Sequence, residues 1–166
     1  MKTQTKSAQT VELLLVEDNE DDVVLTRESF LATDSSVNLH RVENGELCMA
    51  YLRKQPPFEN APTVALVLLD INMPRMDGRE VMAAITADAT LRHLPVVVLT
   101  TSTAETDILQ MYALRCSSYI VKPVSLAEFI QAITKLEDYW WGVVALPNGQ
   151  SSHVCKNEIA STCFDR

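Results

Sequence analysis

The sequence has fewer basic than acidic residues, and it has no long apolar run. Its 14 Lys and Arg residues stand against 22 Asp and Glu residues, which leaves a net charge of −8. A nucleic-acid-binding protein needs a basic face to neutralise phosphates, and an anionic membrane repels an acidic chain. The apolar runs are far shorter than the about 20 residues that a membrane helix needs. We therefore expect no nucleic-acid partner and no membrane partner.

The sequence also lacks the features of a secreted protein. Its first ten residues are polar and contain no apolar core of the kind found in a secretory signal. Four cysteines in 166 residues do not form a disulfide framework. Cys48 and Cys116 fall within expected helices, where we interpret them as small buried hydrophobic residues. The expected localisation is the cytoplasm.

Five short β-prone runs alternate with five helical patterns along the chain. The expected strands cover residues 11–16, 37–42, 64–69, 96–99 and 119–121. The expected helices cover residues 21–32, 47–54, 79–87, 104–114 and 126–141, the last two with Thr103 and Ser125 as N-caps. Such alternation predicts an α/β fold with a doubly wound, five-stranded parallel sheet in the order 2-1-3-4-5, which is the flavodoxin-like arrangement.

A single domain accounts for most of the chain. We expect residues 1–10 to be a disordered N-terminus and residues 11–147 to be the folded domain. Residues 148–166 are polar and have no periodicity, so we expect a disordered C-terminal tail.

Residues that can bind a metal or a phosphate follow four of the expected strands. They are Glu17 and Asp18 after the first strand, Asp70 after the third, Thr100 after the fourth and Lys122 after the fifth. Parallel strands end at the same edge of a sheet, and strands 1 and 3 flank the switch point of this strand order. We therefore expect these five side chains to meet at that edge.

Three carboxylates at one point repel one another unless a cation joins them. Oxygen ligands without histidine or cysteine favour a hard ion, so the expected cofactor is Mg²⁺. Its expected ligands are the side chains of Glu17, Asp18 and Asp70, together with the backbone carbonyl of Asn72.

An aspartate beside magnesium can act as a nucleophile on a phosphoryl group and form an aspartyl-phosphate. The transition state spreads negative charge over the phosphoryl oxygens, which must be met by cations and hydrogen-bond donors. Asp70 is thus the candidate phosphoacceptor, with the Lys122 ammonium and the Thr100 hydroxyl as further candidate catalytic groups.

With these site residues, the segment 11–141 resembles the receiver domain of response regulators in two-component signalling. Glu17 and Asp18 match the acidic pair of that family, and residues 70–78 match its phosphoacceptor loop. Lys122 and Pro123 match its Lys-Pro dipeptide. The resemblance also implies switch roles for Thr100 and for the aromatic residue Tyr119.

The resemblance implies that a sensor histidine kinase or a histidine phosphotransfer protein supplies the phosphoryl group to Asp70. It further implies a cis peptide bond between Lys122 and Pro123. Thr100 would move inward on phosphorylation and Tyr119 would rotate, which would change the surface of the fourth helix, fifth strand and fifth helix. We expect a protein that catalyses only its own phosphoryl transfer and dephosphorylation, with no output domain.

A narrower similarity is to single-domain regulators that partner phytochrome-type kinases. It is carried by the acidic segment 16–22, the proline-rich insertion before the third strand and the ending at residues 140–147. It implies a phytochrome-type sensor kinase as one possible partner.

Three alternatives to this function stay open at the level of the sequence. A phosphatase of the haloacid-dehalogenase type needs an aspartate as general acid two residues after its nucleophile, where this chain has Asn72. A flavin carrier needs a hydroxyl-rich phosphate loop after the first strand, where this chain has an acidic segment. The third alternative is a scaffold with the receiver fold that takes no phosphate.

The last expected helix carries two adjacent tryptophans, Trp140 and Trp141, which cannot both face the core of an isolated helix. We expect one buried ring and one partly exposed ring. Tryptophan is enriched at interfaces. The exposed ring, with Tyr139, Val143 and Val144, therefore indicates a homodimer or partner surface on the C-terminal helix face.

Overall fold

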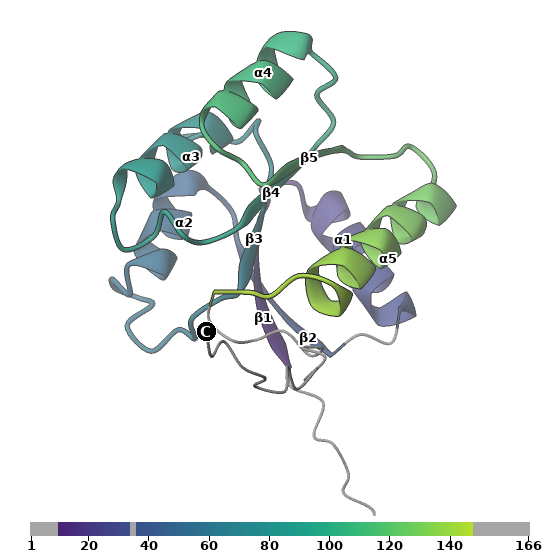
Figure 1. The fold of residues 1–166 in the computed structure, drawn as a ribbon, viewed down its shortest axis with the longest axis horizontal. Helices are drawn as coiled ribbons and strands as arrows, with labels where there is room; N and C mark the ends of the chain where they lie inside the picture. Colours follow the sequence, from purple (N-terminus) through teal and green to yellow (C-terminus); the bar gives the residue numbers. More distant parts are fainter. Residues whose placement is uncertain (1–9, 34–35, 148–166) are drawn as a thin grey trace, which may run out of the picture.

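The computed structural model describes residues 10–33 and 36–147 (Figure 1). The segments expected to be disordered, residues 1–10 and 148–166, lie outside the described residues except for Thr10. The described strands are β1 (Val11–Val16), β2 (Val37–Val42), β3 (Leu66–Leu69), β4 (Val96–Thr100) and β5 (Ser118–Val121). The described helices are α1 (Glu20–Ala32), α2 (Gly45–Leu52), α3 (Gly78–Ala87), α4 (Glu105–Ala113) and α5 (Leu126–Gly142).

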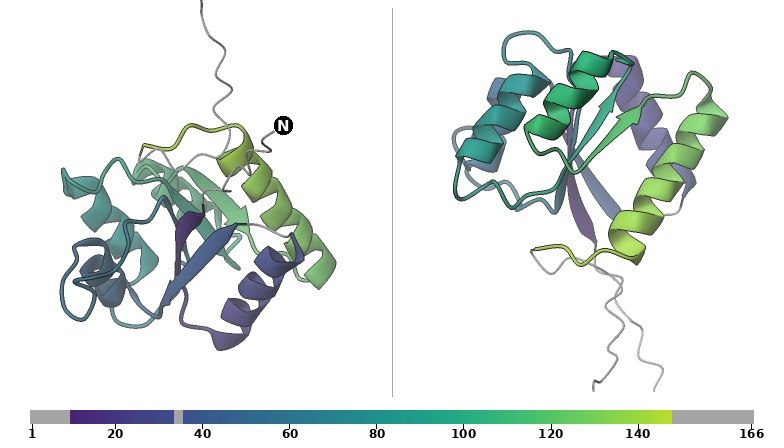
Figure 2. Two further views of the ribbon diagram at one scale, coloured as in Figure 1. Left: turned by 90° about the horizontal axis from the view of Figure 1, so that it is seen from below. Right: turned by 45° about the horizontal axis from the view of Figure 1, so that its top comes forward.

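The described strands form one parallel sheet in the order β2-β1-β3-β4-β5, which confirms the predicted fold class. Helices α1 and α5 cover one face of this sheet, and α2, α3 and α4 cover the other (Figures 1 and 2). No described helix has both the length and the apolar character that a bilayer crossing requires.

Alternate residues of the central strands supply the cores on the two faces. Leu13 and Leu15 of β1 pack into the cluster that contains α1 and α5, whereas Leu14 and Val16 pack into the cluster that contains α2 and α3. This alternation follows from the two-residue repeat of side chains along a strand. Because both faces are covered, all four side chains are buried, and the strand is an almost continuous apolar run.

Two predictions about α4 and its surroundings are wrong. The helix begins at Glu105 and has Ala104 rather than Thr103 at its N-cap, without a side-chain hydrogen bond there. The hydroxyl of Ser102 instead accepts the Ala104 N–H at 3.3 Å, so the loop before α4 supplies the polar partner. Cys116 lies after α4 rather than within a helix, although Cys48 lies in α2 and both cysteines are buried as expected.

The expectation of one exposed tryptophan on α5 is also wrong. Trp140 is 8% exposed and Trp141 is 9% exposed. Both rings lie in the apolar cluster with Leu146, because the chain beyond α5 crosses the lower end of the fold (Figure 1). Helix geometry predicts an exposed ring only for an isolated α5, whereas Leu146 and Val144 of the following segment pack in the same cluster.

Candidate functional site

The register of the sheet brings the predicted site residues to one edge. Val16 of β1 lies beside Leu69 of β3, so the next residues, Glu17 and Asp70, leave the sheet together. The Asp70 N–H donates to the Val16 carbonyl at 3.0 Å. On the other side of β3, the Lys122 N–H donates to the Thr100 carbonyl at 2.7 Å. Backbone hydrogen bonds between neighbouring strands thus fix the positions of Asp70 and Lys122 at this edge of the sheet.

Three carboxylates meet at this edge. One oxygen each of Glu17, Asp18 and Asp70 lies within 4.8 Å of the others. Glu17 and Asp70 are buried, with 2% and 7% of their surfaces exposed, whereas Asp18 is exposed. An all-oxygen set that combines two buried carboxylates with one open to solvent fits a hard divalent cation that keeps part of its water shell. The carbonyl of Asn72, in the loop after β3, stays a prediction as a fourth ligand.

The side chain of Arg41, at the end of β2, holds the acidic pair in place by hydrogen bonds to the backbone carbonyls of Glu17 and Asp18. Its Nε donates to the Glu17 carbonyl at 3.1 Å, and its Nη2 donates to the Asp18 carbonyl at 3.4 Å. The same guanidinium forms an ion pair with Glu20 at 3.0 Å. Sequence reasoning missed Arg41, because nothing in an exposed, alternating strand indicates which side chain reaches across to a neighbouring loop.

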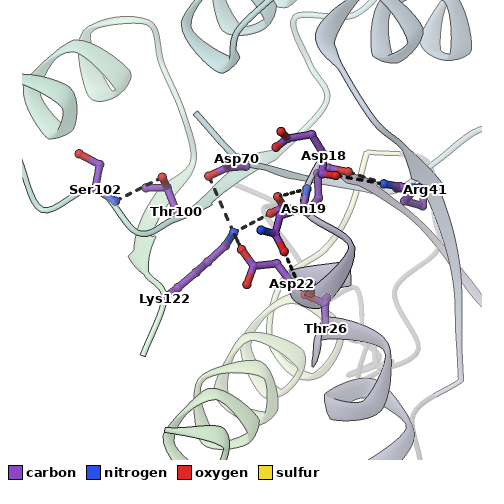
Figure 3. Close-up of polar contacts among 10 residues, drawn as sticks. Asp18, Asn19, Asp22, Thr26, Arg41, Asp70, Thr100, Ser102 and Lys122 are labelled. Carbon is purple, nitrogen blue, oxygen red and sulfur yellow. Dashed lines mark hydrogen bonds and ion pairs between the residues drawn. The ribbon is translucent and has the colours of Figure 1, made fainter. Parts of the chain in front are cut away.

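Lys122 enters the cluster from β5 and contacts three carboxylates (Figure 3). Its Nζ lies 2.6 Å from Glu17 Oε2 and 2.8 Å from Asp22 Oδ2, but 3.9 Å from Asp70 Oδ1. Asp22 is not among the predicted site residues, because its only signal in the sequence is its place as the last acid of the segment after β1. Lys122 itself is where the prediction placed it.

The expected cis bond between Lys122 and Pro123 is not found. Among the described residues the cis peptide bond joins Pro56 to Pro57. The long side chain of Lys122 spans the distance to the carboxylates without a cis bond before Pro123.

The carboxylate cluster carries more negative charge than one ammonium neutralises. Burial raises the pKa of Asp70, against the opposing effects of the Lys122 charge and of hydrogen bonds from the Thr100 hydroxyl and the Ile71 N–H. Burial also raises the pKa of Glu17, against its hydrogen bond with Lys122. Burial acts to lower the pKa of Lys122, but hydrogen bonds to Asp22 and Glu17 outweigh it and raise that pKa. An additional cation would relieve this excess charge.

Thr100 connects the carboxylates to the loop before α4. It is fully buried, and its Oγ1 accepts the Ser102 N–H at 3.4 Å. The Tyr119 hydroxyl donates to the Ser102 carbonyl at 3.0 Å, so the two predicted switch residues contact the same loop residue. Ser102 in turn donates its hydroxyl hydrogen to Asp107 Oδ2 of α4 at 2.6 Å.

Gly78 allows the start of α3 to approach the end of β3 closely. A Cβ atom at this position would lie 2.4 Å from the Asp70 carbonyl oxygen and 2.7 Å from the Ile71 Cα. The Gly78 N–H donates to the Ile71 carbonyl at 2.9 Å. The loop that carries Asp70 is therefore closed by a backbone contact that only glycine permits.

Comparisons with known proteins agree with this architecture. A family model of the response regulator receiver domain matches residues 13–134. Response regulator Rcp1 of Synechocystis sp. is 38% identical over 135 residues, which cover 81% of this chain and 92% of Rcp1.

Two solved structures of similar proteins extend this agreement to three dimensions. The phosphorylated cyanobacterial phytochrome response regulator RcpA is 39% identical, with a TM-score of 0.79, over 83% of this chain and 99% of RcpA. The Mn(2+)-bound form of Rcp1 is 37% identical, with a TM-score of 0.77, over 82% of this chain and 99% of that one. The chain therefore belongs to the response regulator receiver domain family of two-component signalling.

Proposed function

We propose that this chain accepts a phosphoryl group on Asp70 from the phosphohistidine of a sensor histidine kinase or of a histidine phosphotransfer protein. The observation that carries the proposal is the surroundings of Asp70. Its largely buried carboxylate lies with those of Glu17 and Asp18 within 4.8 Å, and the Lys122 ammonium is 3.9 Å away. A carboxylate flanked by a cation site and an ammonium is arranged for attack on a phosphoryl group.

In this reaction an oxygen of Asp70 forms a bond to phosphorus while the phosphorus–nitrogen bond to the donor imidazole breaks. The electron pair of that bond leaves on the imidazole nitrogen. Glu17, Asp18, Asp70 and the Asn72 carbonyl would hold Mg²⁺, which would supply positive charge against the phosphoryl oxygens. Lys122 and the Thr100 hydroxyl stabilise the oxygens that face β4 and β5.

The signal then passes through Thr100 to the surface formed by α4, β5 and α5. A phosphoryl oxygen that draws the Thr100 hydroxyl inward competes with its contact to the Ser102 N–H, and Tyr119 is hydrogen-bonded to the same Ser102. Leu109 and Tyr112 of α4 are 63% and 50% exposed. Exposed apolar side chains on the helix that follows a switching loop support a binding surface whose shape depends on phosphorylation.

The kinase partner in this proposal is of the phytochrome type, and the protein acts in the cytoplasm. The support is similarity to RcpA, which is described as a phytochrome response regulator. A homodimer through the C-terminal face of α5 stays part of the proposal. Tyr139 and Val143 remain available for it, being 55% and 76% exposed, but the two buried tryptophans do not.

The test is the mass of the protein after incubation with Mg²⁺ and acetyl phosphate. We expect the wild type to gain one phosphoryl group, and we expect no gain for Asp70→Asn or in the presence of a chelator. A folded, Mg²⁺-binding protein that gains no mass would contradict phosphoryl transfer and leave the alternative of a scaffold.

A further inference from the structure

Hydrogen bonds fix the backbone of Asp22 in the first turn of α1, and its carboxylate is not among the three clustered ones. Its N–H donates to the Asn19 side chain at 3.1 Å, and its carbonyl accepts from the Thr26 hydroxyl at 2.8 Å. Its carboxylate points at Lys122 and accepts a hydrogen bond from Nζ at 2.8 Å (Figure 3). The carboxylate therefore reaches Lys122 from a backbone held by α1, and not from the loop that carries Asp70.

Lys122 and a divalent cation compete for the same carboxylate. Glu17 Oε1 accepts the Asn19 N–H at 3.0 Å, and Glu17 Oε2 accepts from Lys122 at 2.6 Å. Each oxygen of the Glu17 carboxylate thus accepts one hydrogen bond from the protein. A cation bound to Glu17 would repel the nearby ammonium and so weaken its hydrogen bond to Glu17. The ammonium would then need another anionic partner, because 95% of its side-chain surface is buried.

Asp22 can be that partner. It contacts Lys122 but does not belong to the carboxylate set Glu17, Asp18 and Asp70. Asp70 is a poorer alternative, since its nearest oxygen is 3.9 Å from Nζ and it belongs to the set that the cation requires.

We infer that Asp22 is a positioning residue for Lys122: it holds the ammonium when a divalent cation takes Glu17, and so it favours cation binding. The inference rests on the proposed function, because it takes Glu17, Asp18 and Asp70 as ligands of the cation. The acidic segment after β1 thus has two roles: Glu17 and Asp18 bind the cation, and Asp22 holds Lys122.

The experiment measures Mg²⁺ affinity in the full, unphosphorylated chain by following backbone amide shifts in nuclear magnetic resonance spectra. The same spectra show whether each variant is folded. The test variant is Asp22→Asn, and the matched control is Asp21→Asn, which removes the same charge from the neighbouring exposed residue. We expect Asp22→Asn to weaken Mg²⁺ binding about tenfold, which is a typical coupling between two sites. We expect Asp21→Asn to weaken it less than about threefold, as for a screened surface charge.

The same substitutions in a Lys122→Met protein distinguish a role of Asp22 in positioning Lys122 from a simple loss of negative charge. In Lys122→Met there is no ammonium for Asp22 to hold, so Asp22→Asn should change Mg²⁺ affinity no more than Asp21→Asn does. Asp22→Glu, which keeps the carboxylate, should restore most of the affinity in the presence of Lys122. If Asp22→Asn has the same effect with and without Lys122, or matches Asp21→Asn in the wild-type background, the inference is wrong.

Phosphorylation by acetyl phosphate, followed by mass in parallel, separates this inference from the proposed function. A wild type that shows the Lys122-dependent effect of Asp22 on Mg²⁺ affinity but gains no phosphoryl group would contradict the proposed function alone. A wild type that is phosphorylated but shows no such dependence would contradict the role of Asp22 alone.

Discussion

Arg79 of α3 and Asp107 of α4 form an ion pair in which Nη2 lies 2.5 Å from Oδ1. The other oxygen of Asp107 accepts the Ser102 hydroxyl at 2.6 Å, so one carboxylate connects two helices and the loop that follows Thr100. The hydrogen bond from Ser102, reinforced by Arg79, lowers the pKa of Asp107. The position of α4 is therefore tied to the loop through which the proposed signal passes.

The first prediction concerns this connection. Asp107→Asn removes the ion pair with Arg79 and weakens the hydrogen bond from Ser102, so α4 should be held less firmly. We expect amide hydrogen exchange in α4 of the unphosphorylated protein to become about tenfold faster, as for the loss of about 1.4 kcal/mol of local stability.

Glu105→Gln is the matched control for this prediction. It removes a charge from the same first turn of α4, but Glu105 is exposed. The amide hydrogen exchange rates in α4 of this variant should stay close to those of the wild type. Equal acceleration in both variants would show that α4 responds to charge at its N-terminus rather than to the contact with Arg79 and Ser102.

The second prediction concerns the stability cost of the metal-free carboxylates. Burial raises the folded-state pKa of Asp70, so its charged form is disfavoured in the fold. Below the unfolded pKa, near 4, Asp70 is protonated in both states and costs nothing. As pH rises through the raised folded pKa, the folded protein must release a proton that it holds more tightly, and its stability falls.

Asp70→Asn removes this cost. At pH 7 in the presence of a chelator, we expect the variant to be more stable than the wild type by about 1 kcal/mol in urea denaturation. The difference should shrink as pH falls toward 4, and excess Mg²⁺ should reverse it by stabilising the wild type alone. A wild type that is as stable as Asp70→Asn at pH 7 without metal would contradict the burial cost.

The fold was predictable because the pattern that specifies it is local. Residues 11–16 and 37–42 were predicted as strands with the bounds that β1 and β2 have, and both strands are short, β-prone runs. The strand order follows from alternation of strands and helices under the right-handed crossover rule. With the order known, the residue after each strand end was enough to bring Glu17, Asp70 and Lys122 together.

The parts that were missed depend on contacts between distant segments. Arg41 reaches the acidic pair from β2, and Asp22 reaches Lys122, which is 100 residues away in the sequence. Neither contact has a periodic signal. The N-cap of α4 was misplaced at Thr103 because Thr103 looks like a cap from its residue type, although Ser102 is the residue that turns toward the helix.

The third prediction concerns the backbone contact at Gly78. Gly78→Ala would place a Cβ atom 2.4 Å from the Asp70 carbonyl oxygen, and backbone atoms cannot move aside as a flexible side chain can. We expect a loss of about 3 kcal/mol in the free energy of unfolding, measured by urea denaturation. The displaced Asp70 loop should also weaken Mg²⁺ binding.

Gly142→Ala is the control for Gly78→Ala. Gly142 is the last residue of α5, and a Cβ atom there would meet no atom within 4 Å. Alanine is the better helix former, so this variant should gain up to about 1 kcal/mol. Opposite signs for the two substitutions are the expected result, and destabilisation by both would contradict the explanation from close approach at Gly78.

The fourth prediction concerns the two tryptophans of α5, where an argument from one helix was wrong. Because Trp140 and Trp141 are both buried in the cluster that contains Leu146, truncation of either ring should open a cavity. We expect Trp140→Ala and Trp141→Ala each to lower the free energy of unfolding by about 3 kcal/mol in urea denaturation. Tyr139→Ala, at a position 55% exposed, should cost less than about 1 kcal/mol. If only one tryptophan variant is destabilised, the other ring lies at the surface, and it again becomes a candidate for the homodimer interface.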